Sequence, residues 1–104
     1  MPAEKLEYSR RASLEVAEID LWWLLNRPKN PNLFEDELRQ AEEHLLRAPL
    51  GVEVHAVRNG VELRRHVLTG SRHHVYYHYE ASTKTVHIVA VRGAIKEKDP
   101  ELDD

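Results

Sequence analysis

The stretch LRRHVLTGSRHHVYYHYE, Leu63 to Glu80, predicts two antiparallel strands joined by the short polar turn TGSR. It carries three arginines, four histidines and three tyrosines, where a simple buried strand would be dominated by valine and isoleucine. A small sheet with so many cations and rings either solvates one face with them or uses that face to contact a charged partner.

The sequence on both sides of this stretch predicts further strands of the same sheet. VEVHAV, which begins at Val52, alternates with a period of two, and Asn59-Gly60 after it is a strong signal for a tight hairpin turn. KTVHIVAVR follows Glu80 after another short turn. Together these segments predict a meander of three or four antiparallel strands.

The first predicted helix is apolar on two sides. It follows an expected edge strand, KLEYS at residues 5–9, and runs from an N-cap at Ser13 to about Asn26. One apolar stripe consists of Leu14, Ala17, Leu21, Leu24 and Leu25. A second stripe, on nearly the opposite side, consists of Val16, Ile19 and Trp23. One side is expected to cover the sheet, and the other to meet the second helix or a partner.

A second helix is predicted after the break NRPKNPN at residues 26–32, with Asn30 or Asn32 as its cap. Its buried stripe consists of Phe34, Leu38, Ala41, Leu45 and Ala48. Pro49 and Gly51 end it. The two helices should form an antiparallel hairpin on one side of the sheet, which makes an α+β two-layer fold. Residues 1–98 are expected to form a single domain, and residues 99–104 a charged tail that frays.

Composition narrows the class of protein. The net charge is −3, which argues against a nucleic-acid binder. The charge is unevenly distributed: residues 1–57 hold seven Lys/Arg and eleven Asp/Glu, whereas residues 58–98 hold eight Lys/Arg and three Glu. There is no cysteine. No apolar run approaches the roughly 20 residues of a membrane span, and the start lacks a signal-peptide stretch. A cytoplasmic protein without membrane contact is therefore expected.

A tight turn between the last two strands predicts which residues share a face. Tyr77 opposite Ile88, Tyr79 opposite Val86 and Val75 opposite Ala90 would form the face that packs on the helices. The other face would present His74, Tyr76 and His78, opposite Val91, Val89 and His87. Arg64 and Arg65 point to opposite sides, so one of them joins this second face. A slip of one residue would exchange the two faces.

Metal binding and hydrolytic motifs are not indicated. His74 and His78 are four residues apart on a strand, roughly 13 Å, so they cannot share an ion directly. No third ligand is evident for a zinc site, and no metal or other cofactor is expected. GxSxG, HExxH and glycine-rich phosphate loops are absent. A metal-independent ribonuclease stays open, because it needs only a base, an acid and cations. Sheet packing is the favoured interpretation of the tyrosines.

The ordered set of segments resembles the ParE/RelE superfamily of toxins from bacterial type II toxin–antitoxin modules. The segments that carry the resemblance are AEIDLWWLLNRPKNPNLFEDELRQAEEHLLRAPLGV at residues 17–52, VELRRHVLTGSRHHVYYHYE at residues 61–80 and VHIVAVRG at residues 86–93. The resemblance covers roughly residues 5–98 and implies a helical hairpin packed on a curved antiparallel sheet. It also implies a small growth-inhibiting toxin, of a kind that includes plasmid stabilisation systems, neutralised by a cognate antitoxin in a hetero-oligomer.

The resemblance implies roles for particular residues. The second stripe of the first helix offers a docking surface for the antitoxin, formed by Val16, Ile19, Trp22 and Trp23. Target binding is expected from Arg64, Arg65, Arg72, His74, His78 and Arg92. In a RelE-like nuclease, which cleaves messenger RNA on the ribosome, the candidate catalytic residues are Arg64, Arg65, Tyr76, His78, Arg92 and Lys96.

Departures from the nuclease pattern distinguish between the ParE-like and RelE-like branches of the superfamily. Nuclease members commonly carry a C-terminal Tyr or His, but RGAIKEKDPELDD has neither, and the chain is acidic overall. These departures favour a ParE-like toxin that inhibits DNA gyrase by protein binding and is not an enzyme. The alternatives are a RelE-like endoribonuclease acting on the ribosome and its messenger RNA, and a degenerate toxin that retains only antitoxin binding.

Overall fold

The computed structural model describes residues 2–94, which form two helices and one five-stranded sheet. In chain order the elements are β1 (Lys5–Tyr8), α1 (Arg10–Asn26), α2 (Leu33–Arg47), β2 (Val54–Arg58), β3 (Val61–Leu68), β4 (His73–Glu80) and β5 (Thr85–Gly93). The strand order is β1-β5-β4-β3-β2, with β1 parallel to β5 and the other neighbours antiparallel. The predicted α+β fold is confirmed, with a mixed sheet because β1 joins it in parallel. The predicted tail, residues 99–104, lies outside the described residues.

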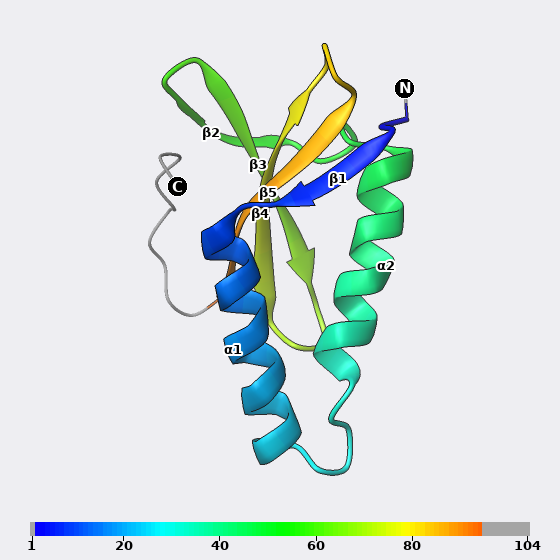
Figure 1. Cartoon of the computed structure of the whole chain (residues 1–104), viewed down its shortest axis with the longest axis vertical. Helices are drawn as coiled ribbons and strands as arrows, with labels where there is room; N and C mark the ends of the chain where they lie inside the picture. The colour runs from blue at the N-terminus through cyan, green and yellow to red at the C-terminus, as the bar shows by residue number, and fades with distance from the viewer. Residues whose placement is uncertain (1, 95–104) are drawn as a thin grey trace.

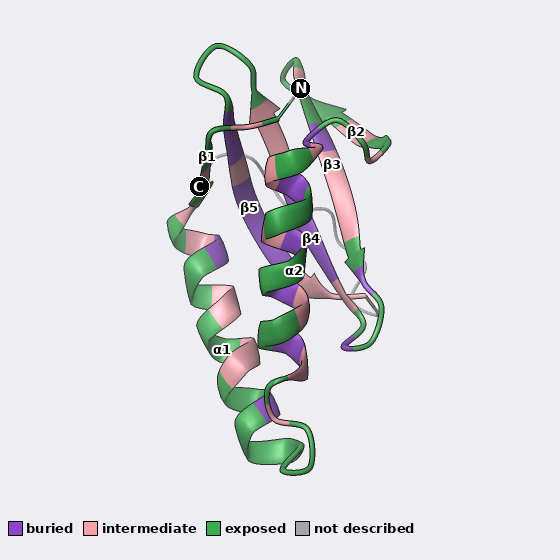
Figure 2. Ribbon diagram, turned by 90° about the vertical axis from the view of Figure 1, so that its right-hand side faces the viewer, coloured by how far each residue is buried: buried purple, intermediate pink, exposed green. Residues whose placement is uncertain are grey.

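Both helices lie on one side of the sheet, α1 against β5 and α2 against β3 (Figure 1). Figure 2 shows buried residues along β4 and β5 and on the side of α2 that faces them. The core between the layers consists of Ala12, Trp23, Phe34, Leu38, Ala41, Leu45, Leu68, Val75, Tyr77, Val86, Ile88 and Val91. No helix within residues 2–94 is long and apolar enough to cross a membrane.

α2 begins where the sequence predicted. Asn32 occupies its N-cap position, although its side chain makes no capping hydrogen bond. Glu35 and Asp36 lie in the first turn, where the positive end of the helix dipole stabilises carboxylates. Four of the five residues of the predicted stripe are buried, whereas Ala48 is the C-cap residue and is partly exposed.

A β-bulge changes the predicted register between β4 and β5. Tyr77 pairs with Ile88 as predicted, but its neighbour Tyr76 pairs with Ala90, which leaves Val89 as an extra residue. The pairings predicted beyond this point are wrong, and the observed ones are Val75 with Val91 and His74 with Arg92. Because of the extra residue, Val89 and Ala90 both lie on the side of the sheet away from the helices. Val91, the next residue, packs in the core between the sheet and the helices.

α1 begins one turn earlier than predicted. Ser9, not Ser13, is the N-cap: its Oγ accepts a hydrogen bond from the backbone N–H of Ala12 at 3.1 Å. The same hydroxyl donates to the carbonyl of Val89 at 3.2 Å. The helix start is therefore held by a contact with β5 that is 80 residues away along the chain, which local sequence patterns do not reveal.

Replacing Ser9 with alanine is expected to lower the free energy of unfolding by about 1 kcal/mol, because the cap at the start of α1 is lost. Ser13→Ala is the matched control. Ser13 is exposed inside the helix, so that variant should be neutral or slightly stabilising. Urea unfolding followed by circular dichroism measures both. Equal losses in the two variants would contradict the assigned cap.

Candidate functional site

The side of the sheet that faces away from the helices carries the predicted cations and rings. We call it the ring-bearing face and define it by Arg65, His74, Tyr76, His78 and His87. Arg65 pairs with Tyr76, and His78 pairs with His87. The rings contact one another: the centroids of His74 and Tyr76 are 6.1 Å apart, and those of His78 and His87 are stacked at 4.8 Å. The prediction that His74, Tyr76, His78 and His87 share a face is confirmed, and of the two strand arginines it is Arg65 that joins them.

Part of this face is buried, which the sequence did not predict. Tyr76 is 1% exposed and packs with Leu63, Val89 and Ala90 in a small second core. His74 is buried as well. The expectation of exposed rings over a floor of valines is therefore wrong at these two positions. A phenol this deeply buried is poorly placed to exchange protons with a substrate.

The two strand arginines have different environments. Arg64 is on the helix side, where it pairs with Tyr77 across β3 and β4. Its guanidinium donates to the carbonyl of Val52 and to Glu62, so it ties β3 to the segment before β2. The expectation that Arg64 belongs to the target-binding surface is not supported by this placement. Of these two arginines only Arg65 is on the ring-bearing face, where it lines a hollow of about 370 Å³.

The other predicted cations are dispersed. Arg92 donates from Nε to Glu15 at 3.1 Å, and Glu15 also accepts the backbone N–H of Val91 at 2.9 Å. This cluster ties β5 to α1. Arg72 lies in the turn between β3 and β4, with a left-handed φ of 60° and an exposed side chain. Lys96 lies outside the described residues. The structure thus does not gather the six predicted catalytic residues into one site.

His78 and His87 form a stacked pair of imidazoles on the ring-bearing face. Nε2 of His87 is 2.9 Å from a carboxylate oxygen of Glu80, which orients that imidazole. Burial, together with the neighbouring His87, lowers the pKa of His78, although Glu80 opposes the shift. His78 is consequently neutral at neutral pH and can accept a proton. Within residues 2–94 no group of three or more His, Asp or Glu residues is arranged to hold a metal ion.

The structure buries the stripe of α1 that was predicted to bind the antitoxin and exposes the other stripe. Val16, Ile19 and Trp23 pack against the core. The other stripe faces outward, and with its neighbour Trp22 we call it the outer stripe of α1. Its large members are Leu14 at 57% exposed, Leu21 at 56%, Trp22 at 46%, Leu24 at 61% and Leu25 at 69%. Of the four predicted antitoxin-binding residues, only Trp22 is therefore exposed.

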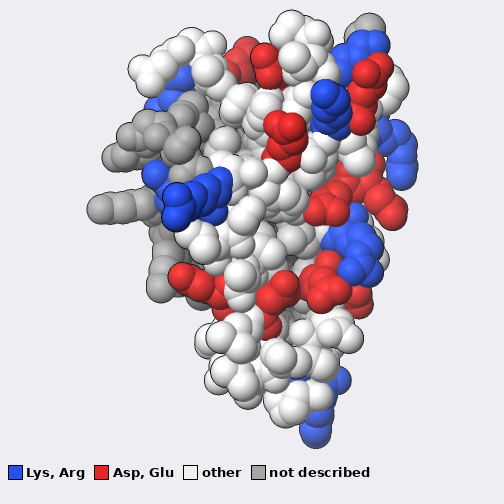
Figure 3. All heavy atoms as spheres, viewed as in Figure 1, with Lys and Arg blue, Asp and Glu red and all other residues white. Residues whose placement is uncertain are grey.

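In Figure 3 acidic side chains gather over the middle of the helical side, whereas the lower part of this view shows few charged side chains except basic ones at its tip. The exposed leucines and Trp22 belong to one helix within twelve residues of one another. Exposed large apolar side chains that gather in this way mark a contact site more often than isolated exposed leucines do.

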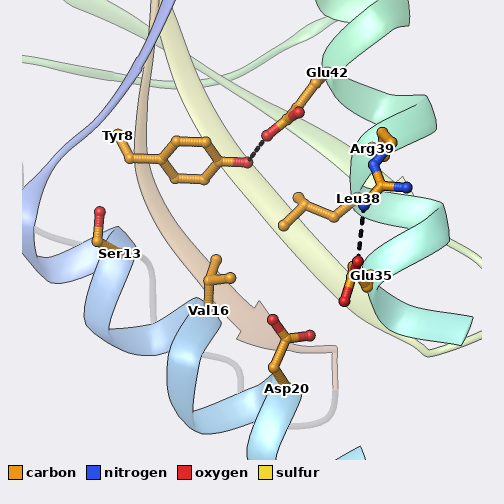
Figure 4. Close-up of a pocket in the computed structure, with 8 residues that line it drawn as sticks. All are labelled: Tyr8, Ser13, Val16, Asp20, Glu35, Leu38, Arg39 and Glu42. Carbon is orange, nitrogen blue, oxygen red and sulfur yellow. Dashed lines mark hydrogen bonds and ion pairs between the residues drawn. The ribbon is translucent and has the colours of Figure 1, made fainter. Parts of the chain in front are cut away.

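An acidic groove separates α1 from α2 (Figure 4). Its volume is about 370 Å³. Tyr8 donates its hydroxyl to Glu42, and Arg39 pairs with Glu35 at 2.7 Å. Burial, with Glu35 nearby, raises the pKa of Asp20, which points into the same groove. No local sequence pattern predicts this groove, because its carboxylates come from two helices.

Solved structures that share this fold include two from toxin–antitoxin systems. One belongs to the "Chromosomal ParDE TA system from P. aeruginosa": the TM-score is 0.66 at 16% identity, and the match covers 88% of this chain and 96% of that chain. The other belongs to the toxin–antitoxin complex RelBE2 from Mycobacterium tuberculosis, with a TM-score of 0.56, 18% identity, and coverage of 90% and 95%. At this identity the likeness shows a shared fold. No protein-family model and no curated protein matches the sequence.

Proposed function

We propose that this chain is the toxin of a type II toxin–antitoxin module and that its antitoxin covers the outer stripe of α1. The observation that carries the proposal is this stripe, which exposes four leucines and Trp22 on a helix whose other side is already packed. An amphipathic helix that lays its apolar face on such a line is a common mode of peptide recognition. The two solved structures with the same fold both come from toxin–antitoxin systems.

For the target, we propose the ParE-like mode, in which the toxin inhibits DNA gyrase by binding it. The support is chemical. Tyr76 is buried, and Arg64 and Arg92 are held by contacts within the fold, so few of the candidate nuclease groups can reach a substrate. Arg65 and Arg72 can still bind a carboxylate or phosphate of a partner.

A RelE-like ribonuclease is the second candidate, and one observation favours it. His78 lies against His87, which Glu80 orients, so a proton acceptor and an oriented imidazole are adjacent on the ring-bearing face. Arg65 is on the same face and could hold a phosphate. The third candidate is a chain that has kept antitoxin binding and lost toxicity.

Expression of the chain without its antitoxin in growing bacteria separates these functions. We expect filamentous cells and induction of the DNA-damage response while translation continues. An immediate arrest of amino-acid incorporation would instead identify the ribonuclease, and normal growth would identify the inactive chain. Arg65→Ala should fold normally and abolish growth inhibition, whereas Arg47→Ala, which removes an exposed arginine on α2, should not.

A further inference from the structure

Two histidines face each other between the second helix and the sheet. His44 is on α2 and His66 is on β3, and we call them the helix–strand pair. Their ring centres are 5.5 Å apart and the ring planes are inclined by 35°. Alternation along β3 puts His66 on the same side as Leu68, which packs in the core beneath the helices. None of the functions considered above uses either histidine.

The helix–strand pair lines a polar hollow between α2 and β3. The volume of this hollow is about 290 Å³, and its other polar side chains are those of Glu37, Gln40 and Thr69. His44 is exposed and His66 is half-buried. The ring nitrogens of His66 are not among the unpaired polar atoms of residues 2–94 that are sealed from solvent. A ligand in the hollow can therefore reach both imidazoles.

The nitrogens of these two rings are available for a ligand. Within residues 2–94 neither His44 nor His66 makes a hydrogen bond through its ring, and their contact is with each other. Burial, together with the neighbouring His44, lowers the pKa of His66, so this ring is uncharged at neutral pH. A neutral imidazole carries a lone pair on one nitrogen, and this is the form in which histidine binds metal ions.

The separation of the rings fits two imidazoles on one ion. A ligating nitrogen lies about 2.0–2.1 Å from zinc, so the centres of two rings on a tetrahedral ion are roughly 5 Å apart. A small rotation of either side chain brings the observed 5.5 Å to that value. The stacked pair on the ring-bearing face is less suitable, because Nε2 of His87 is already 2.9 Å from a carboxylate oxygen of Glu80.

The charge around the hollow favours a cation. Among the described residues that line it, Glu37 is the one acidic residue and none is Lys or Arg. The carboxylate oxygens of Glu37 accept the backbone N–H groups of Gly70 at 2.7 Å and Ser71 at 2.8 Å. Although burial opposes the shift, these bonds lower the pKa of Glu37, which stays charged. Glu37 thus contributes negative charge beside the pair while its own oxygens are engaged.

We propose that His44 and His66 together bind one divalent transition-metal ion, such as Zn²⁺, with water in its remaining positions. Two protein ligands are fewer than the three or four of ordinary zinc sites, so we expect an exchangeable ion with a Kd on the order of 10 µM. The two ligands are 22 positions apart in the sequence, and the fold brings them together. The ion therefore fastens α2 to β3 and stabilises the folded chain. This proposal does not rest on the toxin function.

Isothermal titration calorimetry with ZnCl₂ tests the site on the full chain without a histidine tag. His44→Gln and His66→Gln should each weaken binding at least about tenfold, because each removes one of two ligands. His55→Gln, which removes a half-buried histidine on β2, should leave it unchanged. Mg²⁺ should not bind, since it requires oxygen ligands. Zn²⁺ should also raise the urea midpoint of the parent chain in a saturable way, and not that of His44→Gln.

His44 is exposed, so its variant should fold normally and keeps the test decisive even where His66→Gln does not fold. Parent-like affinity in His44→Gln would overturn the site. A loss confined to His78→Gln would move the ion to the stacked pair, and equal binding of Mg²⁺ would assign it to carboxylates. No binding at about 1 mM Zn²⁺ would leave the pair as a packing contact. None of these outcomes depends on whether the chain inhibits growth, so failure here is distinguishable from failure of the proposed toxin function.

Discussion

A chain that carries both Leu21→Ser and Leu25→Ser is expected to bind its antitoxin at least about 100-fold more weakly than the parent chain. Each leucine is more than half exposed in the free protein, at 56% and 69%. Covering a leucine side chain contributes about 1.5–3 kcal/mol, and two such losses correspond to the stated change in Kd. The antitoxin to be used is the product of the neighbouring reading frame, and isothermal titration calorimetry gives both affinities.

The control for this experiment is Val57→Ser. Val57 is 58% exposed on β2, far from the helices in the fold, so its replacement should leave antitoxin affinity unchanged. Neither variant should change the urea midpoint of unfolding by much, since exposed positions contribute little to stability. Parent-like affinity in the double variant would move the antitoxin to another surface.

Replacing Tyr77 with alanine is expected to lower the free energy of unfolding by about 3–5 kcal/mol. The ring is fully buried between the helices and the sheet, and its hydroxyl donates to the carbonyl of Pro49 at 2.8 Å. That bond fixes the chain between α2 and β2 to the central strand. Much of the total stability of a small domain would be lost, so the variant should be partly unfolded at 37 °C.

Tyr77→Phe separates the ring from its hydroxyl. The phenylalanine ring keeps the packing but leaves the buried Pro49 carbonyl without its donor, which should cost about 1 kcal/mol. Equilibrium urea unfolding at 25 °C measures both variants. A loss below about 1 kcal/mol in Tyr77→Ala would show that this ring is not part of the main core.

The fold could be predicted from the sequence because the spacing of apolar residues distinguishes its helices from its strands. In α2, four of the predicted apolar positions are buried against the sheet. A helix with a single apolar stripe can bury that stripe in only one orientation. In α1 two stripes compete, and composition favoured neither. The structure buries the stripe that contains Trp23 and exposes the one that contains Leu25, so the apolar side chains left accessible to a partner are those of the other stripe.

The candidate site could be predicted only in part, for a related reason. Alternation along a strand correctly placed His74 and His78 on one face but left open whether Arg64 or Arg65 joins them. It could not reveal the bulge at Val89, because residues 88–91 are all apolar and their sequence therefore shows no alternation to interrupt. Nor could it show that Tyr76 is buried or that Trp23 lacks a hydrogen-bond acceptor, since both depend on contacts between distant segments.

The parallel pairing of β1 with β5 has a consequence for how the protein is made. Residues 5–8 join residues 85–88, so the sheet cannot close while the ribosome is still adding the last strand. Contacts that span nearly the whole chain form late in folding, because loop closure must precede them. A nascent chain therefore reaches its finished shape only after synthesis of β5. The order of synthesis therefore leaves the edge of β5 that receives β1 as the last part of this sheet to be completed.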